Sequence, residues 1–309
     1  MPLVSVVVPT FNEENNVEPL FLQIKDMFEQ KLSSYDYEVI FIDNLSSDGT
    51  RARLRELAGR FGQVKCIFNK RNFGQFNSPY YGLLNSGGDC CILLCADFQD
   101  PPELIPDFIK LWEDGSKVVV GVKKESRESR FMYFARGMYY KLLRRFSDTG
   151  IIEHFTGFGL YDREFIDTLK SVEEPAPFLR AMVGELGYSY KTVEYVQNKR
   201  FSGKSSNNFM RLYDAGMLGI TTYTKFLVRA AVFFGIILCG LFLIPTVFLL
   251  AENLFDASDD KLLYLLLCFF GVIFGFQTFF TGILGEYIIT LSRRVSNRPL
   301  VVEDERINF

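Results

Sequence analysis

Apolar runs and amphipathic stretches alternate along residues 1–100 of the chain. The run LVSVVVP at 3–9 is apolar apart from one serine, which is typical of a strand buried on both faces of a sheet. In the following stretch apolar side chains recur every three or four positions, which predicts a helix with one buried face. This alternation predicts an α/β domain with a mostly parallel sheet, whose ligands bind at the carboxyl ends of the strands. The predicted strands are 3–9, 37–43, 64–69 and 90–96, and the predicted helices are 15–30, with Val17, Leu20, Phe21, Ile24 and Phe28 on its buried face, and 48–61.

Two long apolar runs follow in the last third of the chain. Residues 230–251 carry no charge, and at ~1.5 Å per residue a helix of this length crosses a hydrocarbon core of ~30 Å. Residues 262–285 form a second such run, so we predict two transmembrane helices, with a buried helical hairpin as the alternative. Basic residues flank the pair and the loop between them is acidic, which predicts that both termini are cytoplasmic. The predicted organisation is a cytoplasmic domain at 1–208, an interfacial amphipathic segment at 209–229, a two-helix transmembrane region at 230–291 and a cytoplasmic tail at 292–309.

Charge and composition narrow the function classes. The net charge of -3 at pH 7 is close to neutral, so we expect no nucleic-acid partner. The six cysteines lie in apolar surroundings without C-x-x-C spacing, as reduced core residues do. His154 is the single histidine, which excludes a histidine-rich metal site. Any metal ion must therefore be held by oxygen ligands.

Polar motifs stand where the predicted strands end. The first strand runs into PTFNEE, the second into IDN and the third into KRNFG. Asp43 ends a buried strand and so needs a partner, which the hydroxyls or base edge of a ligand would supply. Asp48 with Gly49 is by contrast a turn and helix-cap signal. Asn72 and Gly74 permit a close approach of the backbone to a ligand.

The segment CADFQDPPE at 95–103 carries candidate metal ligands. Asp97 and Gln99 are two positions apart, so in an extended segment their side chains point to the same side. Two hard oxygen ligands suit a divalent cation such as Mg²⁺ or Mn²⁺, with the other positions left for water and phosphate oxygens. Pro101 and Pro102 then predict the start of a helix.

In this order and spacing the motifs resemble the family 2 inverting glycosyltransferases of the GT-A fold. Among them they are similar to dolichyl-phosphate mannose synthase and bacterial undecaprenyl-phosphate glucosyltransferases, over residues 3–204 and the two apolar runs. The resemblance implies a Rossmann-like catalytic domain followed by two transmembrane helices, a nucleotide-sugar donor, and a polyisoprenyl phosphate acceptor in the membrane lipid. Asp97 and Gln99 match the ligands of the divalent metal (Mg²⁺ or Mn²⁺) on the diphosphate, and Asp43 matches a nucleotide-binding aspartate. The residues expected to bind the donor are Pro9, Thr10, Asn12, Glu13, Asp43, Asn72, Gly74, Asp97 and Ser205.

The chain departs from the family pattern in ways that bear on the chemistry. Cys95 stands where the family usually has the first residue of Asp-Ala-Asp, and Asn44 replaces a second aspartate after Asp43, so the site attracts a cation less strongly. The place of an aspartate near the acceptor falls on His154 or Gly157, so we assign no general base. A hydroxyl acceptor needs a base, whereas a phosphate monoester is already an oxyanion at neutral pH. The missing base therefore favours an isoprenyl phosphate.

A basic segment, QNKRFSGKSS at 197–206, is the second candidate for chemistry. Arg200 and Ser205 match the family pattern R-x-x-G-x-S, and Lys204 adds a further cation. Arg200 and Lys204 are expected to stabilise phosphate charge during transfer. A solvated basic loop near anionic headgroups is the alternative.

The expected reaction is inverting transfer, and two other functions are alternatives. Asp97, Gln99 and a cation polarise the diphosphate of a nucleotide-sugar, with a UDP-sugar expected, while the lipid phosphate attacks the anomeric carbon from the opposite face. One rival is a membrane-bound transferase acting on a glycan or glycolipid hydroxyl. The other is a catalytically inactive scaffold of a glycan export complex. Gly271 and Gly275 would let helices pack closely in a homo-oligomer.

Overall fold

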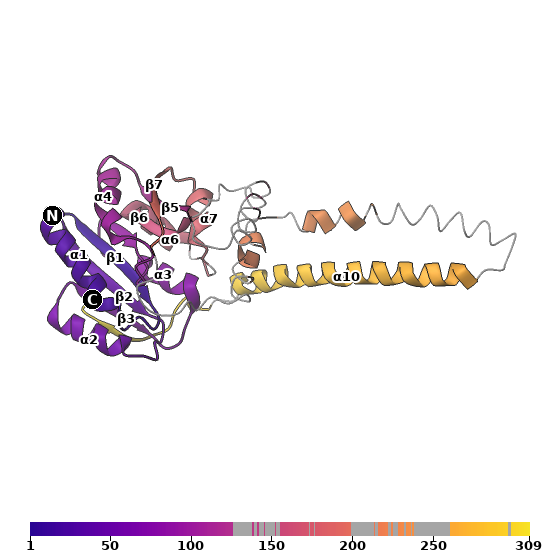
Figure 1. Ribbon diagram of the computed structural model, residues 1–309, viewed down its shortest axis with the longest axis horizontal. Coiled ribbons are helices and arrows are strands. Elements are labelled where there is room, and N and C mark those ends of the chain that lie inside the picture. The colour runs from indigo at the N-terminus through magenta and orange to yellow at the C-terminus, as the bar shows by residue number, and fades with distance from the viewer. Residues whose placement is uncertain are drawn as a thin grey trace. The chain divides into compact units, whose positions relative to one another are not determined.

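The computed structural model describes residues 1–125, 138, 141, 145, 152, 155–172, 174–175, 177–198, 213, 216–221, 224, 228–231, 233–235, 237, 260–295 and 298–309. The chain divides into two compact units, which we describe one at a time. The first consists of residues 1–144, 149–208 and 296–309, and the second of residues 145–148 and 209–295. Both ends of the chain therefore belong to the first unit (Figure 1).

A mixed sheet runs through the first unit. Its described strands are β1 (Leu3–Thr10), β2 (Asp36–Asp43), β3 (Val64–Asn69), β4 (Cys90–Leu93), β5 (Val118–Glu125), β6 (Phe155–Asp162), β7 (Tyr190–Val196) and β8 (Glu303–Ile307). They are arranged in the order β7-β5-β6-β4-β1-β2-β3-β8. The block β4-β1-β2-β3 is parallel throughout, as the sequence predicts. Antiparallel pairs then extend it, β6 beside β4 and β8 beside β3.

Helices cover both faces of this sheet, and each face has its own hydrophobic core. Because successive strand residues point to opposite faces, Val6 and Val8 enter one core and Val7 enters the other. The first face carries α1 (Val17–Lys31), α2 (Thr50–Arg60), the short 3₁₀ turn η1 (Pro102–Leu104) and α4 (Ile105–Glu113). The second carries α3 (Gly74–Leu84), α6 (Arg163–Val172) and α7 (Leu179–Glu185).

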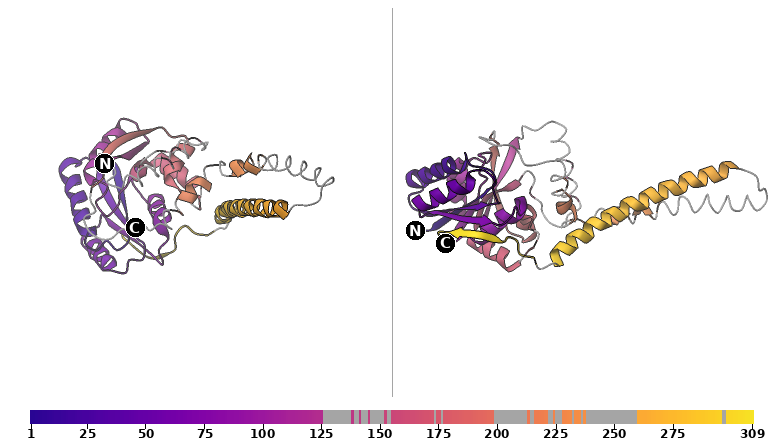
Figure 2. Two further views of the ribbon diagram at one scale, coloured as in Figure 1. Left: turned by 45° about the vertical axis from the view of Figure 1, so that its right-hand side comes forward. Right: turned by 90° about the horizontal axis from the view of Figure 1, so that it is seen from below.

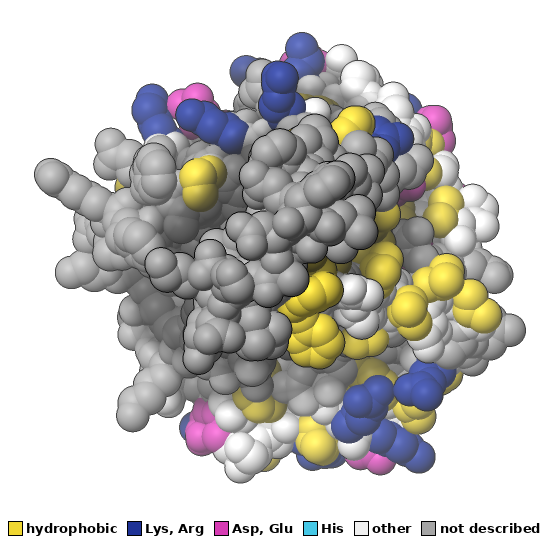
Figure 3. Space-filling view, turned by 90° about the vertical axis from the view of Figure 1, so that its right-hand side faces the viewer, with side chains coloured by type: hydrophobic (Ala, Val, Ile, Leu, Met, Phe, Trp, Pro, Cys, Tyr) yellow, Lys and Arg dark blue, Asp and Glu magenta, His cyan; other side chains and the backbone are white. Residues whose placement is uncertain are grey.

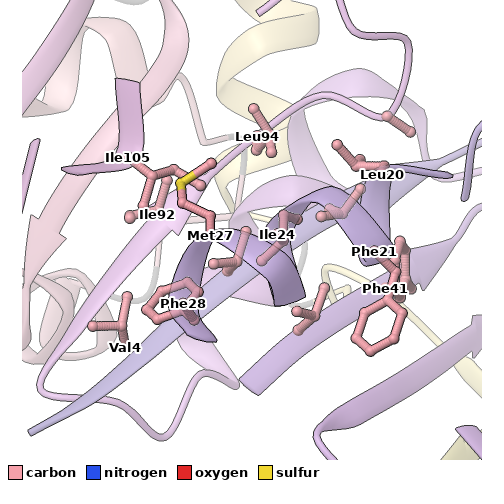
Figure 4. Close-up of a cluster of buried hydrophobic side chains, with 14 of the residues drawn as sticks. Val4, Leu20, Phe21, Ile24, Met27, Phe28, Phe41, Ile92, Leu94 and Ile105 are labelled. Atoms are coloured by element: carbon pink, nitrogen blue, oxygen red, sulfur yellow. The ribbon is translucent and has the colours of Figure 1, made fainter. Parts of the chain in front are cut away.

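The predicted buried face of α1 is confirmed. All five apolar residues that define it in the sequence are buried, and Met27 joins them. Burying a side chain of this size contributes about 1.5–3 kcal/mol, so this face accounts for much of the attachment of α1 to the sheet. Figure 4 shows the packing of Leu20, Phe21, Ile24, Met27 and Phe28 with Val4, Phe41, Ile92, Leu94 and Ile105.

The C-terminal segment 292–309, predicted as a tail, contains a strand of the sheet. β8 pairs antiparallel with β3, and in Figure 2 it runs along the sheet edge in yellow beside the C-terminus. Its sequence EDERI has no apolar run, which is why the hydrophobic pattern gives no strand there. Side-chain hydrogen bonds hold this segment to the neighbouring elements. Asn308 donates to the carbonyls of Ala58 and Val64 at 2.9 and 2.8 Å, and Tyr81 donates to Glu303 at 2.9 Å.

The second unit is helical in its described part. The long helix α10 (Asp260–Val295) contains the predicted second span, 262–285, and Thr221 is hydrogen-bonded to its Thr290 at 2.8 Å. Most of the predicted first span, 230–251, and of the interfacial segment, 209–229, lies outside the described residues. Across the part of the chain that the structure describes, we find no helix whose length and hydropathy together suffice to cross a bilayer. The two spans stay a prediction from the sequence.

A buried ion pair in the first unit makes its stability pH-dependent. Glu38 is 4% exposed, and Lys65 Nζ lies 2.6 Å from its Oε2, while Ser5 and the backbone of Gly87 donate to Oε1. Burial by itself would raise the pKa of Glu38, but the bonds from Lys65, Ser5 and Gly87 outweigh it and lower the pKa below the usual 4.5. The stabilisation by ionised Glu38 is therefore present above pH 4.5 and is lost as the pH falls through the lowered pKa.

We expect Glu38→Gln to lower the free energy of unfolding by about 1–3 kcal/mol at neutral pH, because Lys65 then loses its partner. The difference from wild type should shrink once the pH falls below the usual glutamate pKa. Urea unfolding at a series of pH values measures this. Glu29→Gln, which breaks the exposed pair with Lys25, is the control and should change little. A deficit that stays the same at all pH values would contradict the assignment.

Candidate functional site

Strained backbone collects in the loops that follow the parallel strands. Asn12 after β1, Leu45 after β2 and Phe98 after β4 have φ of 59°, 61° and 59°. Residues with a Cβ rarely adopt these values, and such outliers concentrate at functional sites. Leu45 and Phe98 are absent from the sequence-based candidates, because nothing in their residue type indicates a left-handed backbone. The three loops leave the same edge of the sheet, since β4, β1 and β2 are parallel neighbours.

Asp43, the last residue of β2, is completely buried at this edge. The hydroxyl and the backbone N–H of Ser46 both donate to its carboxylate, and Arg51 Nε lies 3.4 Å from Oδ2. Burial raises the pKa of Asp43, and the bonds from Ser46 and the charge of Arg51 oppose the rise. The protein therefore supplies the partner that this carboxylate needs, whereas the sequence predicts that a ligand supplies it.

Hydrogen bonds tie the loop after β1 to the loop after β2. The backbone N–H of Asn12 donates to Ser46 Oγ at 2.9 Å, and Ser47 N–H donates to Asn12 Oδ1 at 2.8 Å. Glu13 N–H donates to Thr50 Oγ1 at 2.9 Å. The predicted donor-binding residues Asn12, Glu13 and Asp43 thus form one connected group. Pro9 and Thr10 end β1 next to it, with Thr10 Oγ1 donating to the Ile42 carbonyl at 3.3 Å.

Asn44 joins β2 to the turn that opens α3. Its Oδ1 accepts hydrogen bonds from Phe73 N–H at 3.0 Å, Asn69 Nδ2 at 3.0 Å and Ser78 Oγ at 2.7 Å. Its Nδ2 donates to the Gly74 carbonyl at 3.1 Å. The backbone partners fix the orientation of the amide, because an N–H only donates and a carbonyl only accepts. The side chain is therefore engaged by the protein in a way that an aspartate would not reproduce.

The turn of Asn72 and Gly74 has the backbone conformation that its sequence indicates. Gly74 has a φ of +90°, which residues with a Cβ rarely adopt. Gly74 N–H donates to Asn72 Oδ1 at 2.8 Å and closes the turn. Asn44 joins this turn to the end of β2. The loops after β1, β2 and β3 therefore form a continuous edge.

The segment of Asp97 and Gln99 is a turn, and the extended geometry predicted for it is wrong. β4 ends at Leu93, and Asp97 Oδ1 accepts the backbone N–H of Gln99 at 3.2 Å around the left-handed Phe98. Asp97 is 7% exposed. Within the described ranges, no group of three or more His, Cys, Asp or Glu residues is placed to hold a metal ion. A carboxylate and an amide are hard oxygen donors, and they fit a cation that takes its remaining ligands from substrate phosphates.

Asp100 anchors this turn to β7, the strand at one edge of the sheet. It is 2% exposed, and the hydroxyl of Tyr195 on β7 donates to its Oδ1. Burial raises the pKa of Asp100, against the charge of Lys123 and the hydrogen bonds from Tyr195 and Cys95. Cys95 itself is exposed, in the position where the family usually has an acid. Asp100 thus serves the structure of the turn.

The predicted phosphate-binding residues are not placed by the structure. Arg200, Lys204 and Ser205 lie outside the described residues, as does His154. Their roles stay predictions from the sequence.

The model of glycosyl transferase family 2 matches residues 5–170 of the chain. The protein belongs to this family. The predicted family is therefore confirmed, and the protein is a glycosyltransferase.

Relatives of this glycosyltransferase extend over nearly the whole chain. The uncharacterized glycosyltransferase YkcC of Bacillus subtilis (strain 168) is 31% identical over 303 residues, which cover 96% of this chain and 92% of the relative. The SfII prophage-derived bactoprenol glucosyl transferase of Shigella flexneri is 29% identical over 297 residues, 96% of each chain.

The fold of the glycosyltransferase is also found among solved structures. Glucosyl-3-phosphoglycerate synthase of Mycobacterium tuberculosis, in complex with Mn²⁺, UDP and glucosyl-3-phosphoglycerate, matches with a TM-score of 0.52 at 16% identity. The match covers 72% of this chain and 78% of that one. The α/β, mostly parallel GT-A architecture is thereby confirmed for the first unit.

We expect Asn44→Asp to destabilise the glycosyltransferase by about 1–3 kcal/mol, because an oxygen then faces the Gly74 carbonyl and a charge is buried. Asn72→Asp is the matched control. Asn72 uses its side chain as an acceptor towards Gly74, and aspartate keeps that bond. Thermal unfolding of both variants measures the difference. An Asn44→Asp protein as stable as wild type that binds Mn²⁺ more tightly would instead make position 44 a metal ligand.

Proposed function

We propose that the protein transfers a sugar from a UDP-sugar to a polyisoprenyl phosphate, with inversion, at the cytoplasmic face of a membrane. The observation that carries the proposal is the full-length similarity to bactoprenol glucosyl transferases, which includes the C-terminal apolar runs. Similarity confined to the sheet would support glycosyl transfer in general. Similarity that continues through 230–291 supports an acceptor in the membrane.

The nucleoside is proposed to bind at the edge formed by the loops after β1, β2 and β3. Asp43 has no exposed surface while Ser46 and Arg51 cover it, so it would accept a hydrogen bond from the base once the Ser46 side chain has moved aside. Asn12 and Glu13, tied to the loop after β2, line the same edge, next to Pro9 and Thr10. The turn of Asn72 and Gly74 brings exposed backbone to this place. These contacts would orient the donor so that its sugar and diphosphate point towards the turn after β4.

The diphosphate is proposed to bind at Asp97 and Gln99 with a divalent cation. Mg²⁺ or Mn²⁺ there would neutralise charge on the leaving nucleoside diphosphate. Asp97 would supply the carboxylate, and the substrate phosphates would supply ligands that other family members obtain from a second acid. Cys95 stands at the first position of the Asp-Ala-Asp pattern, where it is exposed and adds no oxygen ligand. Arg200, Lys204 and Ser205 would add positive charge and hydrogen-bond donors on the phosphates.

The acceptor is proposed to be a phosphate because the chain offers no assigned base. A phosphate monoester attacks the anomeric carbon as an oxyanion, so no side chain has to remove a proton. Attack on the face opposite the diphosphate inverts the anomeric centre. The hydroxyl-transferring rival would require a base that the motif order does not provide.

The membrane is proposed to hold the two apolar segments 230–251 and 262–285. Large apolar side chains are exposed along α10, and an exposed apolar surface of this kind favours lipid or another helix. Hydrophobic side chains are also visible on the face shown in Figure 3. The exposed residues on α10 include Phe270, Phe274, Phe279, Leu284, Ile288, Ile289 and Leu291.

We expect Asp97→Asn to reduce sugar transfer from UDP-glucose to undecaprenyl phosphate by about 100–1,000-fold, because the diphosphate loses its carboxylate-held cation. Transfer of radiolabelled sugar to the lipid, with Mn²⁺ or with EDTA, measures the rate. Asp107→Asn, at an exposed acid on α4, is the control and should keep full activity.

The product separates the proposal from its rivals. A sugar on a phosphodiester is released by mild acid, whereas a sugar on a hydroxyl is retained. Failure of wild-type protein to label undecaprenyl phosphate from any common nucleotide-sugar would contradict the proposed acceptor. Activity that is unchanged in Asp97→Asn would remove Asp97 from the site, and an inactive wild type would favour the scaffold.

A further inference from the structure

The C-terminal strand turns two consecutive acids towards the same helix. In the pairing of β8 with β3, Phe68 is opposite Glu305 and Asn69 is opposite Glu303, so Asp304 is an extra residue in a bulge. A bulge redirects side chains that would otherwise alternate between the faces. Asp304 and Glu305 accordingly both form ion pairs with α2.

The two acids make two similar pairs with two arginines one helical turn apart. Arg51 Nη2 lies 3.0 Å from Asp304 Oδ2, and Arg55 Nη2 lies 2.6 Å from Glu305 Oε2. Both guanidinium groups also lie over the ring of Phe68, at 5.0 and 4.6 Å from its centroid. We call Arg51, Arg55, Phe68, Asp304 and Glu305 the acid–arginine cluster.

Of the two arginines in this cluster, Arg51 is the one that lies within ion-pair distance of Asp43 in the described part of the chain. Arg51 Nε lies 3.4 Å from Asp43 Oδ2, and Arg51 is 19% exposed against 44% for Arg55. Among the described residues Arg51 Nε is buried and makes no hydrogen bond. A buried donor without a hydrogen bond is uncommon and calls for an explanation. Its position beside Asp43 gives one, because a small shift brings it onto the carboxylate or onto a ligand bound there.

We propose that Asp304 positions Arg51 against Asp43, so that the last strand of the chain belongs to the nucleotide-binding site. Asp304 holds one end of the guanidinium, and the Phe68 ring supports its face, which leaves the Nε edge directed at Asp43. Arg51 and Asp304 are positioning residues, since they act through Asp43. The inference rests on the proposed function, in which Asp43 binds the nucleoside.

The chain offers a matched pair of variants for the test. Asp304→Asn and Glu305→Gln each remove one charge from β8 and one ion pair with α2, but of the two arginines it is Arg51 that lies within ion-pair distance of Asp43 among the described residues. We expect Asp304→Asn to weaken UDP binding by about 5–10-fold, equivalent to about 1–1.4 kcal/mol. Glu305→Gln should change it by less than about 2-fold. Isothermal titration of the full-length protein with UDP measures both, and thermal unfolding should show similar losses of stability.

Enzyme kinetics separate positioning from general damage. Asp304→Asn should raise KM for the UDP-sugar by a factor similar to the loss of UDP affinity and leave kcat near wild type. Arg51→Lys, which keeps the charge but loses the planar fork, should behave in the same way. Asp304→Glu, which restores the carboxylate, should recover part of the affinity.

Each result bears on one claim or the other. Equal effects of Asp304→Asn and Glu305→Gln on UDP binding, including no effect of either, overturn the inference while the proposed function stands. Wild-type protein that binds neither UDP nor GDP overturns the proposed donor site and the inference together. If Asp304→Asn does not fold, Arg51→Lys with wild-type affinity for UDP overturns the inference.

Discussion

The structure of the candidate site depends on the burial of one carboxylate. Asp43 ends the central strand β2 without any exposed surface, and a carboxylate in that position must be surrounded by donors. Ser46 provides two of them and Arg51 provides charge. The chain turns through the left-handed Leu45 just before Ser46, and the Ser46 hydroxyl in turn accepts a hydrogen bond from the backbone N–H of Asn12. The loops after β1 and β2 thus share one polar network.

A second polar centre, Asn44, explains a departure from the family pattern. In the sequence, asparagine in place of aspartate at this position indicates the loss of a charge near a cation. In the structure the amide has four protein partners, and one of them, the Gly74 carbonyl, requires a donor. The residue type is therefore set by the turn that opens α3. Of the two substitutions in the family pattern, Cys95 is the one that lies exposed beside Asp97.

The sequence predicts the parts of the fold that have a strong period. β1 to β3, α1 and α2 begin and end within about two residues of their predicted bounds, because each buries a regular set of apolar positions. α3 was not predicted, since GQFNSPYYGLL carries Pro79 and no clear apolar face. The extended geometry predicted at Asp97 is wrong, because the left-handed Phe98 lies within a turn there, and a left-handed backbone has no signal in this residue type. The partners of Asp43 lie three and eight positions away, where spacing gives no signal.

β8 could not be predicted because its stability comes from the surface that receives it. EDERI has no apolar face, and its side chains are satisfied by arginines and a tyrosine that lie more than 220 positions earlier in the chain. The pair of Arg51 and Asp304 spans 253 positions. Contacts of such separation form late in folding, since the loop-closure entropy must be overcome first. During synthesis the edge that holds Asp43 is therefore completed only after residues 303–307 have been made, and these follow both apolar segments in the sequence.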